Sequence, residues 1–264
     1  MTQTRCLLSL FALSAIAMIA TARADYPVAP DVVVFCDPTL RRVVTDLGAQ
    51  WSKETGIPVR VFAAPTWSNL AQLAHHTRDD VIIGEGDIAA AKAAAEQLIK
   101  GDTVQKLWRN KLVAATLTDE LQKARDASPP IPLDLASVAG KAPVAIVDPS
   151  VDEAGADTQQ ALQTLGLWDM IQAKSVGVVG TADAAYLLSH GDVKLAVLYA
   201  TDVMDHPEFS VTDTLPVAAA EQPIVYWAAQ TQRALSPNAT KFLEFLGRND
   251  IRARGRDAGL EMLP

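Results

Sequence analysis

Short runs rich in β-branched residues alternate along this chain with longer stretches of helical periodicity. The runs span residues 32–35, 59–62, 81–83, 111–116, 144–147, 176–179, 195–199 and 224–228. Between the first two runs, apolar residues from Leu40 to Trp51 recur at 3.6-residue spacing, and Thr55-Gly56 is typical of a helix end. The alternation predicts an α/β fold with mostly parallel sheets covered on both faces. Such folds bind ligands beyond the carboxyl ends of their strands.

The first 24 residues predict the compartment. Arg5 precedes an almost wholly apolar stretch from residue 7 to residue 20, and Ala22-Arg23-Ala24 has the small-x-small pattern of a cleavage site. The apolar stretch is too short for a spanning helix, and Cys6 lies too early for a lipoprotein anchor. We therefore expect residues 1–24 to be a signal peptide, and the chain from about Asp25 to be a soluble protein of the periplasm that is not membrane-spanning.

The composition of the 240 residues that follow limits the kinds of partner that this protein can bind. Their formal charge is −10, because the removed segment contains Arg5 and Arg23 and no acid. Nucleic acid and anionic membranes are poor partners for so acidic a chain, and we expect a monomer with a solvated surface. Only Cys36 remains, so no intramolecular disulfide is possible. The full chain is 49% hydrophobic, so two α/β domains can instead supply the core.

The chain lacks the common catalytic motifs. It contains no P-loop, no paired Cys-x-x-Cys, no Gly-x-Ser-x-Gly and no His-Glu-x-x-His. We therefore expect a protein that is not an enzyme and carries no cofactor. His75 with Asp79, and His76 with Asp80, have the i,i+4 spacing that can place metal ligands on one helical face. We favour the simpler interpretation, in which these histidines complement a helix dipole and bind no metal.

Three segments resemble one known family. They are Leu-Gly-Leu-Trp-Asp at 165–169, Ala-Val-Leu-Tyr-Ala-Thr-Asp-Val at 196–203 and Pro-Ile-Val-Tyr-Trp-Ala-Ala at 223–229. They resemble the second half of the periplasmic molybdate-binding proteins of ABC uptake systems, and the resemblance extends over the mature chain. It implies a type II periplasmic-binding-protein fold with two lobes and a two-strand hinge. Lobe 1 would comprise residues 25–110 completed by 226–264, and lobe 2 residues 111–225.

The resemblance also implies a ligand, partners and a binding site. The ligand would be molybdate or tungstate, and the partners an ABC permease and its ATPase. A tetrahedral dianion in such a protein is held by neutral donors, namely hydroxyls and N–H groups at helix N-termini. Taken singly, each matching residue has a structural alternative as a helix cap or as part of the core. The matching positions are Thr39, Thr66 or, as a second choice, Ser68, then Ala154, Thr181 and Tyr199.

This chain departs from the family at positions that bear on the ligand. Pro65, which cannot donate an N–H, lies where the family has a serine, and Asp37 and Glu85 replace small residues. Asp37 followed by Pro38 is a good helix start, so its carboxylate could have a purely structural role. If Asp37 and Glu85 instead face the cleft, they would repel a dianion and suit a cationic or small organic solute. Cys36 could be a buried hydrophobe or a soft ligand.

Overall fold

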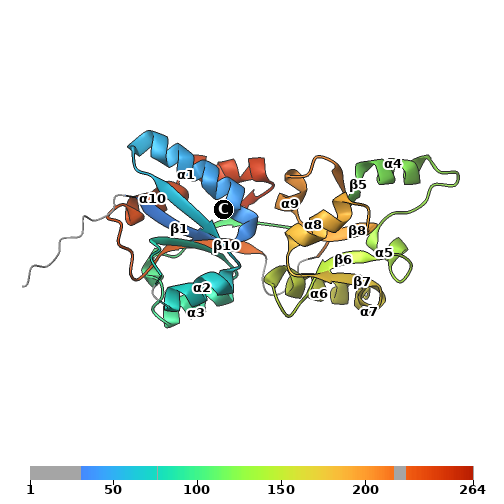
Figure 1. Cartoon of the computed structure of the whole chain (residues 1–264), viewed down its shortest axis with the longest axis horizontal. Helices are drawn as coiled ribbons and strands as arrows, with labels where there is room; N and C mark the ends of the chain where they lie inside the picture. The colour runs from blue at the N-terminus through green and yellow to red at the C-terminus, as the bar shows by residue number, and fades with distance from the viewer. Residues whose placement is uncertain (1–30, 76, 217–223, 264) are drawn as a thin grey trace, which may run out of the picture.

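The computed structural model of the chain describes residues 31–75, 77–216 and 224–263. The predicted signal peptide and His76 lie outside these ranges. Two lobes lie side by side along the long axis of the molecule, and each contains its own sheet with helices on both faces (Figure 1). The predicted two-lobed α/β fold class is therefore confirmed. No helix in the described ranges has the length and apolar character needed to cross a membrane.

The first sheet has six strands in the order β11-β4-β10-β3-β1-β2. Strand β1 pairs in parallel with β2 and β3, whereas β10 runs antiparallel between β3 and β4. The strands of this sheet are β1 (Val32–Cys36), β2 (Val59–Ala63), β3 (Val81–Glu85), β4 (Gln105–Arg109), β10 (Val225–Gln230) and β11 (Glu261–Met262).

The second sheet has five strands in the order β7-β6-β8-β5-β9. Strand β6 pairs in parallel with β7 and β8, and β5 is antiparallel to both β8 and β9. The strands of this sheet are β5 (Leu112–Leu117), β6 (Val144–Val147), β7 (Ser175–Val178), β8 (Leu195–Tyr199) and β9 (Phe209–Thr214).

Both sheets are mixed, so the expectation of mostly parallel pairing needs correction. The antiparallel pairings all involve β5 or β10, the strands that adjoin the two crossings between lobes, or the edge strand β11. Each of the eight predicted strand runs coincides with a strand to within two residues, whereas β4, β9 and β11 were not predicted. Strands β9 and β11 lie at sheet edges, where only Phe209 of β9 and no residue of β11 is buried, so the apolar pattern weakens.

Helices cover both faces of the first sheet. Trp51 of α1 packs against Phe242 and Phe245 of α10 on one face, with ring centroids 5.6 and 5.3 Å apart. On the other face, α2 and α3 pack against Ile82 and Trp227 (Figure 1). The predicted first helix ends as expected, with Gly56 at φ 72°. The helices of this lobe are the short turn η1 (Pro38–Leu40), α1 (Arg41–Thr55), α2 (Thr66–Ala74), α3 (Asp87–Ala95), η2 (Gly101–Thr103), α10 (Ala239–Gly247), α11 (Asn249–Ala253) and η3 (Arg254–Ala258).

The second sheet is covered in the same way. Ala161 and Leu162 of α6 pack on one face with Ile146, while Ala184 and Leu188 of α8 pack on the other. The helices of this lobe are α4 (Thr118–Asp126), α5 (Leu135–Val138), α6 (Glu153–Thr164), α7 (Trp168–Gln172), α8 (Thr181–Ser189) and α9 (Ala200–Met204). Strands β1, β3 and β8 end at Cys36, Glu85 and Tyr199, and the contacts below show that these ends meet between the lobes.

Candidate ligand-binding site

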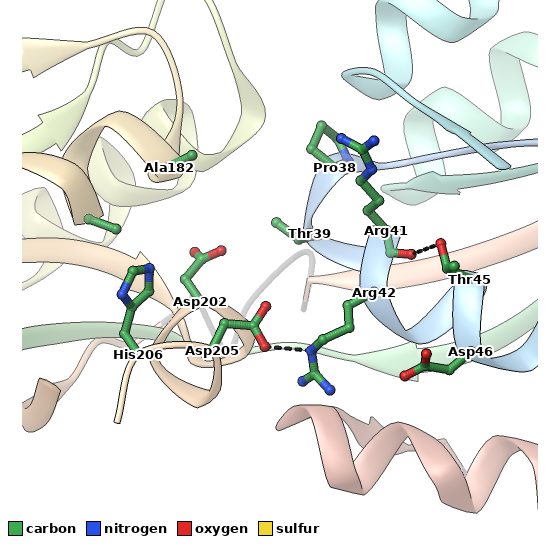
Figure 2. Close-up of a pocket in the computed structure, with 11 residues that line it drawn as sticks. Pro38, Thr39, Arg41, Arg42, Thr45, Asp46, Ala182, Asp202, Asp205 and His206 are labelled. Atoms are coloured by element: carbon green, nitrogen blue, oxygen red, sulfur yellow. Dashed lines mark hydrogen bonds and ion pairs between the residues drawn. The ribbon is translucent and has the colours of Figure 1, made fainter. Parts of the chain in front are cut away.

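A cleft of about 440 Å³ lies between the lobes. One wall comes from η1 and the start of α1, and the other from α8 and α9. Figure 2 shows Asp202 and Asp205 on one side and Thr39 and Arg42 on the other. A salt bridge of 2.5 Å between Arg42 Nε and Asp205 Oδ1 joins the two walls. The lobes therefore lie in contact across this cleft.

Asp37 lies directly after β1 and immediately before Pro38 and Thr39, which line the cleft. Its side chain caps η1, with Pro38 at the start of the turn, as the sequence suggested. The carboxylate accepts hydrogen bonds from the N–H of Thr39 at 3.1 Å, the hydroxyl of Thr39 at 2.7 Å and the hydroxyl of Thr66 at 3.4 Å. Asp37 is only 6% exposed. It therefore caps the turn and also accepts hydrogen bonds from two of the hydroxyls assigned to the ligand.

A directed chain of donors leads to the same carboxylate. Asn110 Nδ2 donates to the hydroxyl of Tyr226 at 3.2 Å, and Tyr226 lies 2.8 Å from Thr39 Oγ1. Because Thr39 uses its only hydroxyl proton on Asp37, Tyr226 must be the donor to Thr39. Asn110 also donates to Thr201 of α9 at 3.1 Å. The Thr39 hydroxyl thus has no proton left to offer a ligand while Asp37 is ionised.

Glu85 accepts a hydrogen bond from Tyr199 of the other lobe. Tyr199 donates its hydroxyl to both carboxylate oxygens of Glu85, at 3.1 and 3.2 Å, across the gap between β8 and β3. The N–H of Glu85 donates to Thr66 Oγ1 at 2.9 Å. Glu85 is 4% exposed and Tyr199 is 2% exposed. Thr39, Thr66 and Tyr199 are therefore linked into one buried network through Asp37 and Glu85.

The two remaining predicted positions also meet carboxylates. The N–H of Ala154 donates to Asp152, the N-cap of α6, at 3.0 Å. Asp202 accepts the N–H of Tyr199 at 2.9 Å, and the Thr181 side chain lies close enough to Asp202 to influence its pKa. The donors that the resemblance assigns to an oxyanion therefore face acids of the chain itself.

Six acids that influence one another's pKa values make up what we call the acidic cluster. They are Asp37, Glu85, Asp152, Glu153, Asp157 and Asp202. Within the described ranges, no salt bridge joins any of them to a lysine, an arginine or a histidine. One oxygen of Glu153 is buried without a hydrogen-bond partner. No salt bridge in the described ranges therefore offsets the charge of those acids in the cluster that are ionised.

Burial and mutual repulsion raise the pKa values of the cluster. Burial, followed by the neighbouring charge of Asp37, raises the pKa of Glu85 well above its ordinary value. Burial also raises the pKa of Asp37 to about 6, although the hydrogen bonds from Thr39 oppose the shift. For the same main reason the pKa of Glu153 rises to about 7 and that of Asp202 to about 6. Part of the cluster is therefore protonated near neutral pH.

Other predicted residues lie away from the network. Ser68 is exposed on α2, so only Thr66 of the two alternatives joins it. Cys36 is fully buried in the core, as expected for a small hydrophobe. Helix α2 ends at Ala74, so the i,i+4 argument for His75 and Asp79 does not apply. Within the described ranges, no group of three or more histidines, cysteines and acids could hold a metal ion.

Sequence reasoning missed several polar residues of the site. Asn110 and Tyr226 lie at the two predicted lobe boundaries, and neither was predicted to belong to the site. Asp152, Glu153 and Asp157 have the acidic pattern that complements the dipole of any helix start. A useful signal would have been a polar residue flanking a strand end, since Asn110 follows β4 directly and precedes β5.

Comparison with known proteins places this geometry in a family. The sequence pattern described as "Bacterial extracellular solute-binding protein" matches residues 32–261. The molybdate-binding protein ModA of Escherichia coli (strain K12) is 26% identical over 185 residues, which cover 70% of this chain and 71% of that protein.

Two solved structures have a similar fold. The periplasmic molybdate-binding protein of Azotobacter vinelandii has a TM-score of 0.73 at 20% identity, over 89% of this chain and 100% of that one. The substrate-binding domain of a putative molybdenum ABC transporter from Clostridium difficile has a TM-score of 0.69 at 18% identity, over 89% and 99%. With the family match over residues 32–261, the conclusion is that this chain belongs to the bacterial extracellular solute-binding proteins.

Proposed function

We propose that this protein is the periplasmic solute-binding component of an ABC uptake system, and that it binds molybdate or tungstate between its lobes. It would deliver the anion to a membrane permease driven by an ATPase, without catalysing a reaction. The observation that carries the proposal is the convergence of Thr39, Thr66 and Tyr199, from three separate segments, on one buried network. The likeness to ModA over 70% of the chain supports the same ligand class.

The acidic cluster sets a condition on this ligand. The repulsion between one ionised carboxylate and one negative charge of the ligand about 4 Å away costs roughly 4 kcal/mol at an effective dielectric near 20. Asp37 and Glu85 already hold the protons of Thr39 and Tyr199. A dianion can use those donors only when the two acids are protonated or turn away. The raised pKa values of both acids favour protonation, and a protonated carboxyl group can itself donate to an oxyanion.

A second candidate is a cationic or small organic solute bound at the same place. The specific observation in its favour is the uncompensated acidic cluster, including the buried oxygen of Glu153 that has no partner. Ionised Asp37 and Glu85 would then accept hydrogen bonds from the ligand. This candidate keeps the fold and the role in uptake, and changes only the charge of the solute.

A thermal-shift panel tests the proposal. Molybdate and tungstate are expected to raise the melting temperature, whereas sulfate and phosphate at equal concentration do much less. A ligand at 100 times its dissociation constant adds roughly 2.7 kcal/mol to the free energy of unfolding. The panel should run at pH 6 and at pH 8, because the acidic cluster changes charge between them. No shift with either metal oxyanion at either pH would contradict the proposal, and a shift with amines that requires Glu85 would favour the second candidate.

At pH 6, where protonation of Asp37 and Glu85 can free the hydroxyls of Thr39 and Tyr199, Tyr199→Phe and Thr39→Val are expected to weaken oxyanion binding without unfolding the protein. Each change removes a hydroxyl from the buried network, and loss of a hydrogen bond to a charged group costs about 1.5 to 3 kcal/mol. The corresponding loss of affinity is roughly 10- to 150-fold, measurable by titration calorimetry. Tyr186→Phe on the exposed side of α8 is the matched control and should bind normally. Unchanged affinity in both site variants would place the ligand elsewhere.

A further inference from the structure

The hydrogen-bond chain that leads to Asp37 begins at Asn110, between the two lobes. Asn110 follows β4 and precedes β5 on the first crossing, and its N–H donates to the carbonyl of Ile224 on the second crossing at 3.0 Å. Its side chain is buried. Because this amide contacts both crossings and the first hydroxyl of the chain, its orientation bears on every proton further along.

The backbone of the next residue fixes the orientation of this amide. The N–H of Lys111 lies 2.9 Å from the Asn110 side-chain oxygen, and a backbone N–H can only donate, so the oxygen must be on that side. The amide nitrogen then faces Thr201 Oγ1 at 3.1 Å and the Tyr226 hydroxyl at 3.2 Å. An amide nitrogen carries two protons and accepts none. Asn110 therefore presents only a donor to Tyr226.

This donor decides where Tyr226 places its own proton. Tyr226 is fully buried, and within the described ranges its hydroxyl forms hydrogen bonds only with Asn110 Nδ2 and Thr39 Oγ1. Because the amide cannot accept, Tyr226 must donate to Thr39, which lies 2.8 Å away. The Thr39 proton cannot then point at Tyr226, and is left for Asp37 Oδ1 at 2.7 Å or for another acceptor. This direction holds whether or not Asp37 is ionised.

Thr39 is the member of this chain that lines the cleft. It is partly exposed on the wall formed by η1 and the start of α1 (Figure 2). Molybdate offers only acceptor oxygens, so it can use the proton of Thr39 but cannot supply one. Hydrogen bonds in a buried chain polarise one another, so the donor at Asn110 also strengthens the donor at Thr39. Asn110 does not line the cleft, and its effect on a ligand passes through Tyr226 and Thr39.

We infer, on the basis of the function proposed above, that Asn110 is a positioning residue for oxyanion binding, which keeps the Thr39 proton directed away from Tyr226 and available to an acceptor in the cleft. A hydroxyl with a freely rotating proton serves a donor as well as an acceptor. The fixed direction therefore favours ligands that present an acceptor at Thr39 over ligands that present a hydroxyl or ammonium group there.

Asn110→Asp reverses the chain at nearly constant side-chain volume. The introduced carboxylate, when ionised, accepts the proton of Tyr226, and the Tyr226 oxygen then accepts the proton of Thr39. Asp37 thereby loses the hydrogen bond from the Thr39 hydroxyl, which lowers the pKa of Asp37 in the wild type. The carboxyl ¹³C resonance of Asp37, followed without ligand, should therefore titrate at higher pH in Asn110→Asp than in the wild type.

Tyr226→Phe separates this effect from the added charge. Without the Tyr226 hydroxyl the chain is cut, so Asn110→Asp acts on Asp37 only through its charge. We expect the substitution to move the Asp37 titration at least about twice as far with Tyr226 present as in Tyr226→Phe. Thr201→Val, which removes the other acceptor of the amide, should leave the Asp37 titration unchanged. The comparison keeps constant the other charges that interact with Asp37, which are those of Glu85, Asp152, Glu153 and Asp202.

The same four proteins test the effect on binding. At a pH where the ¹³C resonance of the introduced carboxyl is that of the ionised form, Asn110→Asp should weaken molybdate binding at least about tenfold more with Tyr226 present than in Tyr226→Phe. Titration calorimetry measures both losses. An equal loss in the two backgrounds, with molybdate bound by the wild type, would overturn the role of Asn110 alone. Absence of oxyanion binding by the wild type would contradict the proposed function as well.

A neutron structure of the deuterated wild-type protein needs no variant to fold. It should place the hydroxyl deuteron of Tyr226 toward Thr39 Oγ1, and the two amide deuterons of Asn110 toward Thr201 and Tyr226. A Tyr226 deuteron directed at Asn110 would overturn the inference, as would equal shifts of the Asp37 titration in both backgrounds.

Discussion

Glu85→Gln is expected to strengthen molybdate binding at least about tenfold at pH 8. The substitution removes a negative charge from the centre of the donor network and leaves an amide that can still receive the hydroxyl of Tyr199. Its magnitude follows from the cost of roughly 4 kcal/mol for a pair of like unit charges about 4 Å apart at an effective dielectric near 20. Titration calorimetry of the variant and the wild type at pH 8 measures the difference.

The pH dependence of binding has a defined sign. Burial raises the pKa of Glu85, so the protonated form that tolerates an anion becomes more populated as the pH falls. Wild-type affinity for molybdate should therefore increase from pH 8 to pH 6, and the slope should be smaller in Glu85→Gln. Asp87→Asn, an exposed acid two residues along the chain, is the matched control for loss of one charge. Weaker molybdate binding in Glu85→Gln at both pH values would contradict the prediction and favour a cationic solute.

The same substitution should also stabilise the unliganded protein at high pH. A carboxyl group whose pKa is raised on folding binds more protons in the folded state, so the free energy of unfolding decreases as the pH rises through the folded pKa. For Asp37 this loss falls between its ordinary pKa of 3.8 and the raised value of about 6, and for Glu85 it begins near the ordinary pKa of 4.5 and continues to higher pH. Urea denaturation of Glu85→Gln should therefore show the largest gain over wild type at pH 8.

Asp80→Ala is expected to lower the free energy of unfolding by at least about 3 kcal/mol. Asp80 is 0% exposed and accepts three backbone N–H groups that join β1 to the turn at residues 235 and 236. Removing the carboxylate leaves these donors without a partner, at roughly 1.5 kcal/mol or more for each bond to a charged group. Urea denaturation at pH 7 measures the effect.

The neighbouring residue supplies the control. Asp79→Asn removes a carboxyl group that makes no hydrogen bond, so it should leave the free energy of unfolding within about 1 kcal/mol of the wild type. A similar loss of unfolding free energy in Asp80→Ala and Asp79→Asn would show that both side chains stabilise the fold equally. It would then contradict the expectation that only the Asp80 side chain stabilises the fold through hydrogen bonds.

Much of the fold could be predicted from local patterns. The strand runs at residues 32–35, 81–83 and 195–199 are short, apolar and flanked by helical periodicity, and all three form buried central strands. Strand β4 was missed because only Leu107 and Trp108 of its five residues are fully buried. The antiparallel directions of β5 and β10 depend on how the chain crosses between lobes, which no local pattern encodes.

The sequence by itself determined the α/β class, the ends of the central strands, and the side chains placed at those ends, because hydrophobic periodicity and helix-start residues act locally. Only the tertiary structure decided which of those side chains become partners. Thr39 meets Tyr226 across 187 residues, and Tyr199 meets Glu85 across 114. Such contacts arise from sheet order and from the apposition of two lobes, and they determine that the donors of the cleft face the protein's own carboxylates.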